Sequence, residues 1–154
     1  MIHFTYTDRP LLPEGKLVYV PGDYAFQTIP PPPVWNSVTV NTFEIFLDAQ
    51  GFVTGGGGYC PCPGWKKKCL TLPVATPGNM RCHGFQDFTT RIPRSLDSAA
   101  WEVCCDNAQG WICIESLEKT SKQCTYIEVL EDFVLGLENA FLNSIWIKLR
   151  GHDA

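Results

Sequence analysis

Cysteine is the residue type of this chain best able to do chemistry, and four of the eight cysteines lie close together in the sequence. Thiolates are ligands that zinc prefers, and four of them can hold a tetrahedral ion that orders a loop without a large core. The sequence therefore suggests a structural zinc site, in which His83 could replace the last cysteine. The four candidate zinc ligands are Cys60, Cys62, Cys69 and Cys82.

The spacing of these cysteines also allows simpler interpretations. Zinc ribbons and fingers typically separate paired cysteines by two to four residues, whereas only Pro61 stands between Cys60 and Cys62. Buried free thiols are therefore the default interpretation, and an adventitious or regulatory disulfide is a third. Cys104 and Cys105 are neighbours on a predicted strand, so their side chains should point to opposite faces and cannot easily share one site.

Patterns typical of catalysis are missing from the sequence. A nucleophilic cysteine needs a base, usually histidine, within hydrogen-bond reach, and the histidines are His3, His152 and His83, which directly follows Cys82. Gly55–Gly58 is not followed by the lysine and Ser/Thr of a phosphate-binding loop, so we expect a flexible loop there. We predict that the protein is not an enzyme and needs no cofactor beyond the zinc considered above.

Negative charge is concentrated in the last third of the chain, although the net charge is only −4. Between Ser95 and Ile147, nine acidic residues are opposed by Lys119 and Lys122 alone. A nucleic-acid binder needs a basic face, so this distribution argues against one. It favours a cationic protein partner, with a merely solvated acidic face as the alternative. The predicted partner-binding residues are Asp97, Glu102, Asp106, Glu115, Glu118, Glu128, Glu131, Asp132 and Glu138.

The elements that would position these residues are predicted from apolar periodicity. Short β-type runs at 2–7, 16–20 and 24–28 precede a hairpin over 38–54, and a second hairpin joins 101–105 to 111–116. Towards the end, apolar residues recur at steps of three and four, which predicts one long helix. These residues are Ile127, Leu130, Val134, Leu137, Phe141, Ile145 and Leu149.

The predicted fold is therefore α+β, with an antiparallel, strand-rich N-terminal two-thirds packed against one long C-terminal helix. We expect one domain over residues 1–154, with a loop-rich segment rich in cysteine, proline and glycine at 55–84. Charged residues interrupt every apolar run well before about 18 residues, so no membrane span is expected. The first residues lack a secretory signal, and we expect a cytoplasmic protein.

The hairpin from Phe43 to Gly57 carries a resemblance to a known class of protein. Its turn, with Asp48 and Gly51 followed by Thr54 and a run of glycines, resembles one seen in small bacterial immunity proteins, which neutralise polymorphic or contact-delivered toxins. The resemblance implies tight binding to a toxin domain, a basic one if the acidic surface contributes. Trp101 and Trp111 would be anchors if exposed. The alternatives are a zinc-stabilised interaction module and a phage or mobile-element accessory protein that assembles with itself.

Overall fold

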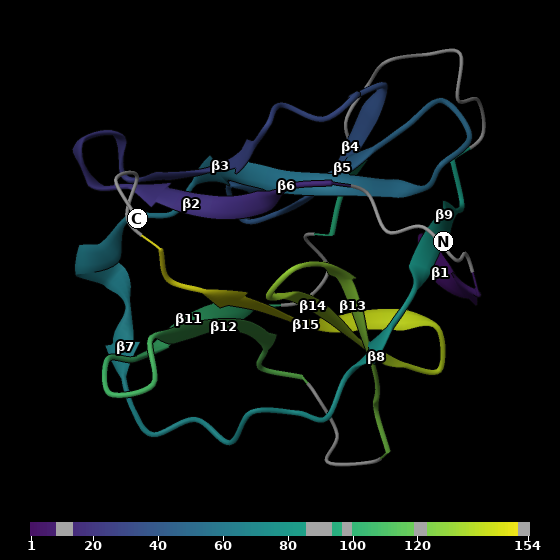
Figure 1. Ribbon diagram of the computed structural model, residues 1–154. Coiled ribbons are helices and arrows are strands. Elements are labelled where there is room, and N and C mark those ends of the chain that lie inside the picture. Colours follow the sequence, from purple (N-terminus) through teal and green to yellow (C-terminus); the bar gives the residue numbers. More distant parts are fainter. Residues whose placement is uncertain (9–13, 86–93, 97–99, 119–122, 151–154) are drawn as a thin grey trace.

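Alternating apolar and polar residues, separated by turn residues, build three β-sheets in the computed structural model of the chain (Figure 1). The structure describes residues 1–8, 14–85, 94–96, 100–118 and 123–150. These residues form strands and two short 3₁₀ turns, η1 (Pro21–Asp23) and η2 (Cys62–Gly64), and contain no α-helix. Accordingly, no helix in the described part of the chain is long and apolar enough to cross a membrane.

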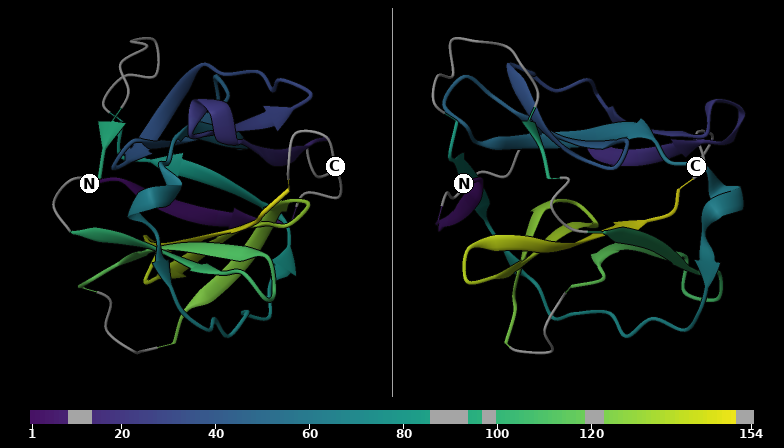
Figure 2. Two further views of the ribbon diagram at one scale, coloured as in Figure 1. Left: turned by 90° about the vertical axis from the view of Figure 1, so that its left-hand side faces the viewer. Right: turned by 180° about the vertical axis from the view of Figure 1, so that it is seen from behind.

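Two of the sheets face each other as layers, as the views of Figures 1 and 2 show. The upper, six-stranded sheet has the order β10 (Arg94–Ser95), β4 (Asn36–Val40), β5 (Phe43–Leu47), β6 (Val53–Tyr59), β3 (Ala25–Ile29) and β2 (Lys16–Val20). The lower, seven-stranded sheet has the order β7 (Lys66–Lys67), β11 (Trp101–Asp106), β12 (Trp111–Ser116), β15 (Phe141–Lys148), β14 (Phe133–Glu138), β13 (Thr125–Leu130) and β8 (Thr76–Pro77). A ribbon of β1 (His3–Thr7) and β9 (Asn79–His83) flanks both layers.

The main core lies between the two layers, because each sheet turns one apolar face inward. Phe43 of β5 and Phe133 of β14 meet there edge to face, with ring centroids 6.2 Å apart. The layers are also joined by the chain end, where the Tyr19 backbone N–H donates to the Arg150 carbonyl over 2.8 Å. Both sheets therefore depend on one shared core.

The predicted C-terminal helix is wrong, and so is the α+β fold class. Residues 125–148 form the antiparallel strands β13, β14 and β15. The chain reverses at Asp132 (φ 57°) and at Asn139 and Ala140 (φ 51° and 69°), left-handed conformations that an α-helix does not contain. Apolar residues on both faces of these strands imitate a helical period, since each face is covered by other parts of the chain.

The predicted flexible loop at Gly55–Gly58 is also wrong. These glycines lie inside β6, and the first three are buried. A Cβ atom at Gly56 would lie 2.9 Å from Phe43 Cζ and 3.1 Å from Phe133 Cζ, so glycine is what lets the core aromatic rings approach this strand.

Other sequence predictions agree with the structure. The strand at Lys16–Val20 and the hairpin between Trp101 and Ser116 are confirmed. The hairpin over 38–54 exists, but its first half is itself two strands, β4 and β5, which turn at Asn41 (φ 53°). The sequence also allows a strand over 85–92, but almost all of these residues lie outside those that the structure describes.

A strap, residues 66–77, covers the outer face of the seven-stranded sheet. Its two ends form β7 and β8, which pair in parallel with β11 and β13 at opposite edges of that sheet. Figure 1 shows the strap in teal, running below the sheet from one edge to the other. The strap and the sheet share a second, smaller apolar cluster. It comprises Leu70, Leu72 and Ala75 of the strap with Cys104, Trp111, Cys113, Tyr126, Val134 and Trp146 of the sheet.

Candidate functional site: a cleft and a charged cluster

A cleft of about 420 Å³ lies where the β4–β5 turn, the end of β6, the segment after η2 and β11 meet. Aromatic side chains of Phe43, Tyr59, Trp65 and Trp101 line it, together with aliphatic residues and the charged pair Lys66 and Glu102. A concave, mainly apolar site of this size with a few polar groups is typical of a binding pocket. We call the hollow that these residues line the cleft.

Packing and hydrogen bonds fix the aromatic walls of the cleft. Trp65 follows η2 and packs against Tyr19 and Phe26, with ring centroids 5.1 Å and 6.4 Å away. The Trp101 indole N–H donates to the Leu96 carbonyl over 3.0 Å. Tyr59 differs, because it is 50% exposed at the end of β6. The cleft is therefore a preformed hollow with one accessible aromatic ring at its rim.

The Cys60 thiol also lines the cleft, and it is a poor nucleophile. Burial raises the pKa of this thiol to about 11. At neutral pH the sulfur therefore stays protonated, whereas a catalytic cysteine needs its thiolate. Its backbone carbonyl accepts the Tyr19 hydroxyl over 2.9 Å, which fixes the turn into η2. The arrangement suits binding better than covalent catalysis.

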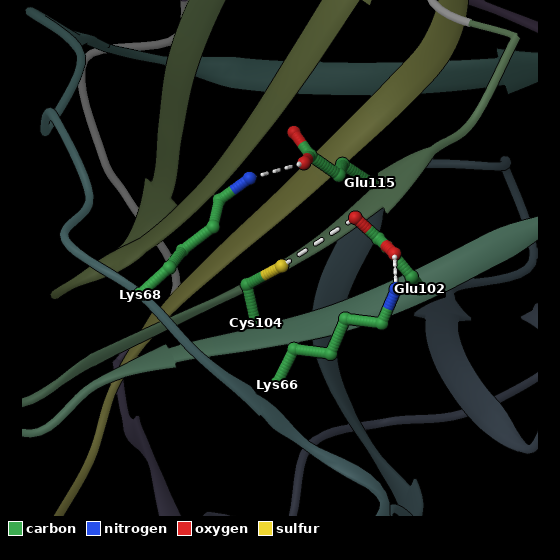
Figure 3. A network of polar contacts seen from close by, with 5 residues as sticks. All are labelled: Lys66, Lys68, Glu102, Cys104 and Glu115. Atoms are coloured by element: carbon green, nitrogen blue, oxygen red, sulfur yellow. Dashed lines mark hydrogen bonds and ion pairs between the residues drawn. The ribbon is translucent and has the colours of Figure 1, made fainter.

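Beside the cleft, on the outer face of the sheet, lies a charged cluster that comprises Lys66, Lys68, Glu102, Cys104 and Glu115 (Figure 3). Glu102 and Glu115 lie directly opposite each other on β11 and β12. Like charges in such a cross-strand pair destabilise the sheet. The strap supplies the compensating cations. Lys66 Nζ lies 2.8 Å from Glu102 Oε2, and Lys68 Nζ lies 3.4 Å from Glu115 Oε1.

These ion pairs also set the protonation of the cluster. The hydrogen bond from Lys66 lowers the pKa of Glu102, and the same bond raises the pKa of Lys66. Cys104 Sγ, which is buried, donates to Glu102 Oε1 over 3.7 Å, and burial raises the pKa of this thiol. At pH 7, Glu102 is therefore a carboxylate, Lys66 carries an ammonium group, and the Cys104 thiol beside them is neutral.

Among the described residues, Glu102, Cys104 and Glu115 form the one group of three potential metal ligands whose donor atoms lie within 4.8 Å of one another. The two lysines already neutralise its carboxylates. A metal ion would have to displace them, so the geometry favours a salt-bridged clasp that ties the strap to the sheet.

The predicted zinc ligands do not converge in the structure. Cys60 and Cys82 are buried, whereas Cys62 and Cys69 are exposed. None of the four belongs to a group of three potential ligands within 4.8 Å, as far as the described residues go. His83, the substitute ligand, instead contacts Thr5 Oγ1 over 2.8 Å and stacks on His3. All eight cysteines are free thiols, but the default interpretation of buried thiols holds for Cys60 and Cys82 and is wrong for Cys62 and Cys69.

Of the predicted acidic surface, Asp106 has an internal role. This residue is 5% exposed and accepts hydrogen bonds from the backbone N–H groups of Leu70, Ala108 and Gln109 and from the Gln109 side chain. These bonds, the one from Leu70 foremost, hold the pKa of Asp106 below its usual range. Asp106 therefore ties the strap to the β11–β12 turn and is not available to a partner.

The remaining predicted acids are distributed over several places. Glu102 and Glu115 belong to the charged cluster, and Glu128 Oε2 accepts the Asp132 backbone N–H over 3.0 Å. Glu131 and Asp132 both pair with Arg150. Glu118 and Glu138 line a separate hollow near the β14–β15 turn. Asp97 lies outside the described residues.

Sequence reasoning missed the cleft itself. Its aromatic residues come from four segments that span positions 43 to 101, and nothing in their spacing indicates that they meet. Trp101 was considered as an anchor only through the resemblance, and the structure places it in the cleft wall, whereas Trp111 lies under the strap. No protein-family profile and no curated protein matches this sequence.

Proposed function

We propose that this chain is a non-enzymatic binding protein, and that its cleft receives an apolar or aromatic side chain of a protein partner. The observation that carries the proposal is the preformed, aromatic-lined cleft of about 420 Å³ with the exposed Tyr59 ring at its rim. Aromatic residues that surround a desolvated pocket are typical of binding hot spots. Burying one large apolar side chain there would contribute roughly 1.5–3 kcal/mol.

Charge supports a basic partner. The chain carries a net charge of −4, and the described residues from 100 onward contain eight acids against Lys148 and Arg150. An acidic surface speeds the encounter with a cationic protein and disfavours anionic ones. Binding alone is sufficient for an immunity protein, which acts by obstructing its toxin. The proposed partner is therefore a basic toxin domain that the protein meets in the cytoplasm.

The experiment that tests the proposal places a photo-crosslinking residue at position 59, with position 74 on the strap as the matched control site, since Val74 is 96% exposed. The partner captured through position 59 is identified, purified and titrated against the wild-type protein, Tyr59→Ala and Val74→Ala. Tyr59→Ala should weaken the affinity about tenfold, and Val74→Ala should leave it unchanged.

Equal affinity for all three proteins would show that the partner does not use the cleft. The Tyr59 side chain is half exposed, so its removal should not prevent folding, which near-UV circular dichroism can check. Trp101→Phe provides a second, milder variant inside the cleft. If native mass spectrometry found a small organic molecule and no protein bound to the wild type, the protein-partner proposal would be wrong.

A further inference from the structure

A second hollow, of about 290 Å³, lies at the end of the seven-stranded sheet. It is formed by the last residues of β12 and by the β14–β15 turn, and we call it the acceptor hollow. Ser116, one of its lining residues, is the cross-strand partner of Trp101 in the cleft wall. The acceptor hollow and the cleft therefore adjoin, so one partner could cover both. The lining residues used below are Ser116, Glu118, Glu138, Phe141, Leu142 and Asn143.

Asn143 is the observation that points to a ligand. Its side chain is 5% exposed, and its Nδ2 group donates to Cys124 Sγ over 3.1 Å. The side-chain oxygen Oδ1 is buried and has no hydrogen-bond partner among the described residues. A buried acceptor without a donor costs about 1–3 kcal/mol, and such groups in folded proteins usually have a partner. The free protein thus leaves one acceptor at this hollow unsatisfied.

The other polar groups of the acceptor hollow are also mainly acceptors. Glu118 and Glu138 bring two carboxylates, and Ser116 Oγ accepts the Glu118 backbone N–H over 3.2 Å. Phe141 and Leu142 supply the apolar part of the wall, and Phe141 is 43% exposed. A group that fits must be cationic, rich in donors and attached to an apolar stem.

We infer that the acceptor hollow binds the guanidinium group of an arginine on the partner protein. A guanidinium offers five donors in a planar fork, which matches two carboxylates and an amide oxygen better than the single head of a lysine does. Its flat face can stack on Phe141, and its aliphatic stem can cover the apolar wall. This inference rests on the proposed function, since it supplies the chemistry by which a basic partner would be recognised next to the cleft.

The test uses the free protein and a small probe, and it does not require the partner. Nα-acetyl-arginine amide is titrated into ¹⁵N-labelled protein, with Nα-acetyl-citrulline amide as the uncharged, nearly isosteric control. We expect saturable shifts of the Asn143 side-chain NH₂ and of the Glu118 and Phe141 backbone amides at about 10 mM arginine probe, because so small a ligand binds weakly. Citrulline should cause less than a fifth of these shifts.

Three variants distinguish binding of the probe at the acceptor hollow from general attraction of the probe to the acidic surface. Glu138→Gln should weaken probe binding about fivefold, whereas Glu131→Gln, which removes an exposed carboxylate at the β13–β14 turn, should leave it unchanged. Asn143→Leu should abolish binding and change the Tm little, because it removes an unsatisfied acceptor together with the hydrogen bond to Cys124 Sγ. Equal shifts with citrulline, shifts confined to cleft residues, or an unchanged affinity in Glu138→Gln would each overturn the inference.

The two proposals can fail separately. If the probe fails to bind while Tyr59→Ala still weakens a protein complex, the cleft proposal stands and the arginine site is wrong. If the probe binds as described but no partner uses Tyr59, the arginine site stands and the cleft has another role.

Discussion

Gly56 illustrates how a single missing side chain positions the core around the cleft. The strand β6 passes so close to the rings of Phe43 and Phe133 that a methyl group has no room. Phe43 also lines the cleft, so the shape of the cleft depends on this close approach. The glycine run therefore has a packing role.

The first prediction is that Gly56→Ala destabilises the protein by about 1–3 kcal/mol, the usual cost of overpacking a core. Gly22→Ala is the matched control, since no atom lies within 4 Å of the added Cβ and its φ is not in the left-handed region. Urea unfolding of both variants measures the difference. Equal stability of the two would mean that β6 does not pack as described.

A second prediction at this scale concerns Asp106. Its pKa is depressed in the folded protein, so its stabilising contribution is complete above the unfolded pKa near 4 and is lost as the pH falls through the folded pKa. Both carboxylate oxygens of Asp106 accept hydrogen bonds from N–H groups. In Asp106→Asn, the amide NH₂ replaces one of these oxygens and faces those N–H donors. We expect a lower Tm at pH 7, and a difference from the wild type that shrinks below about pH 4. Thermal unfolding from pH 7 to pH 2 checks both; a constant difference would contradict the assignment.

At the scale of elements, the strap shields part of the sheet that would otherwise be reactive. Cys104 and Cys113 are a cross-strand pair on the outer face, and both are fully buried beneath the strap. The strap forms strand pairs with the sheet at its two-residue ends, and Leu70 is its one buried residue between them. Leu70 is thus the main apolar contact that keeps the middle of the strap in place.

The third prediction is that Leu70→Ala lowers stability by about 2–3 kcal/mol and makes Cys104 and Cys113 accessible before the other buried thiols. Thiol alkylation followed by peptide mass spectrometry at pH 8 measures the order. Val74→Ala, at an exposed site on the same strap, should leave the order unchanged. If Cys60 or Cys82 reacted first, the strap would not be the weakly held element.

The strap also explains which parts of the fold could be predicted from the sequence. The hairpin with Asp106 at its turn and the strand Lys16–Val20 follow from local turn chemistry and alternation, and both were predicted correctly. The last strands were not, because Val134 and Trp146 are apolar on the face that a remote segment covers. Two-sided burial erases the alternation that marks a strand, and only Asp132 and Asn139 remain as signs of turns.

The candidate site was less predictable for a related reason. The acidic residues were predicted to form one partner-binding surface, but the structure separates them: Asp106 points to the strap, whereas Glu131 pairs with Arg150. Glu118 and Glu138, 20 positions apart in sequence, meet at one hollow because β12 and β14 flank β15. Such a meeting depends on strand order, which no local pattern encodes.

At the scale of the whole molecule, the thiols report on the cooperativity of the fold. Five cysteines are buried, and three of them, Cys60, Cys82 and Cys105, belong to the core that both sheets share. Burial raises the pKa of Cys60 to about 11 and of Cys82 to about 12, which slows their reaction further.

The fourth prediction is that Cys62 and Cys69 are labelled rapidly in the native protein, while Cys60, Cys82 and Cys105 are labelled together at the rate of global unfolding. A denaturant series of labelling rates, compared with unfolding followed by fluorescence, provides the measurement. Separate rates for Cys82 and Cys105 would show that the two layers open independently.

The place of β15 in the lower sheet has a consequence for folding during synthesis on the ribosome. It is made after the other six strands of its sheet, yet it is the fourth of seven in spatial order, between β12 and β14. The ribosome adds roughly 5–20 residues each second. The strands on the two sides of β15 are therefore synthesised before the strand that joins them. The nascent chain therefore exposes apolar edges until β15 has emerged, and a chaperone that shields them during translation would raise the yield of native protein.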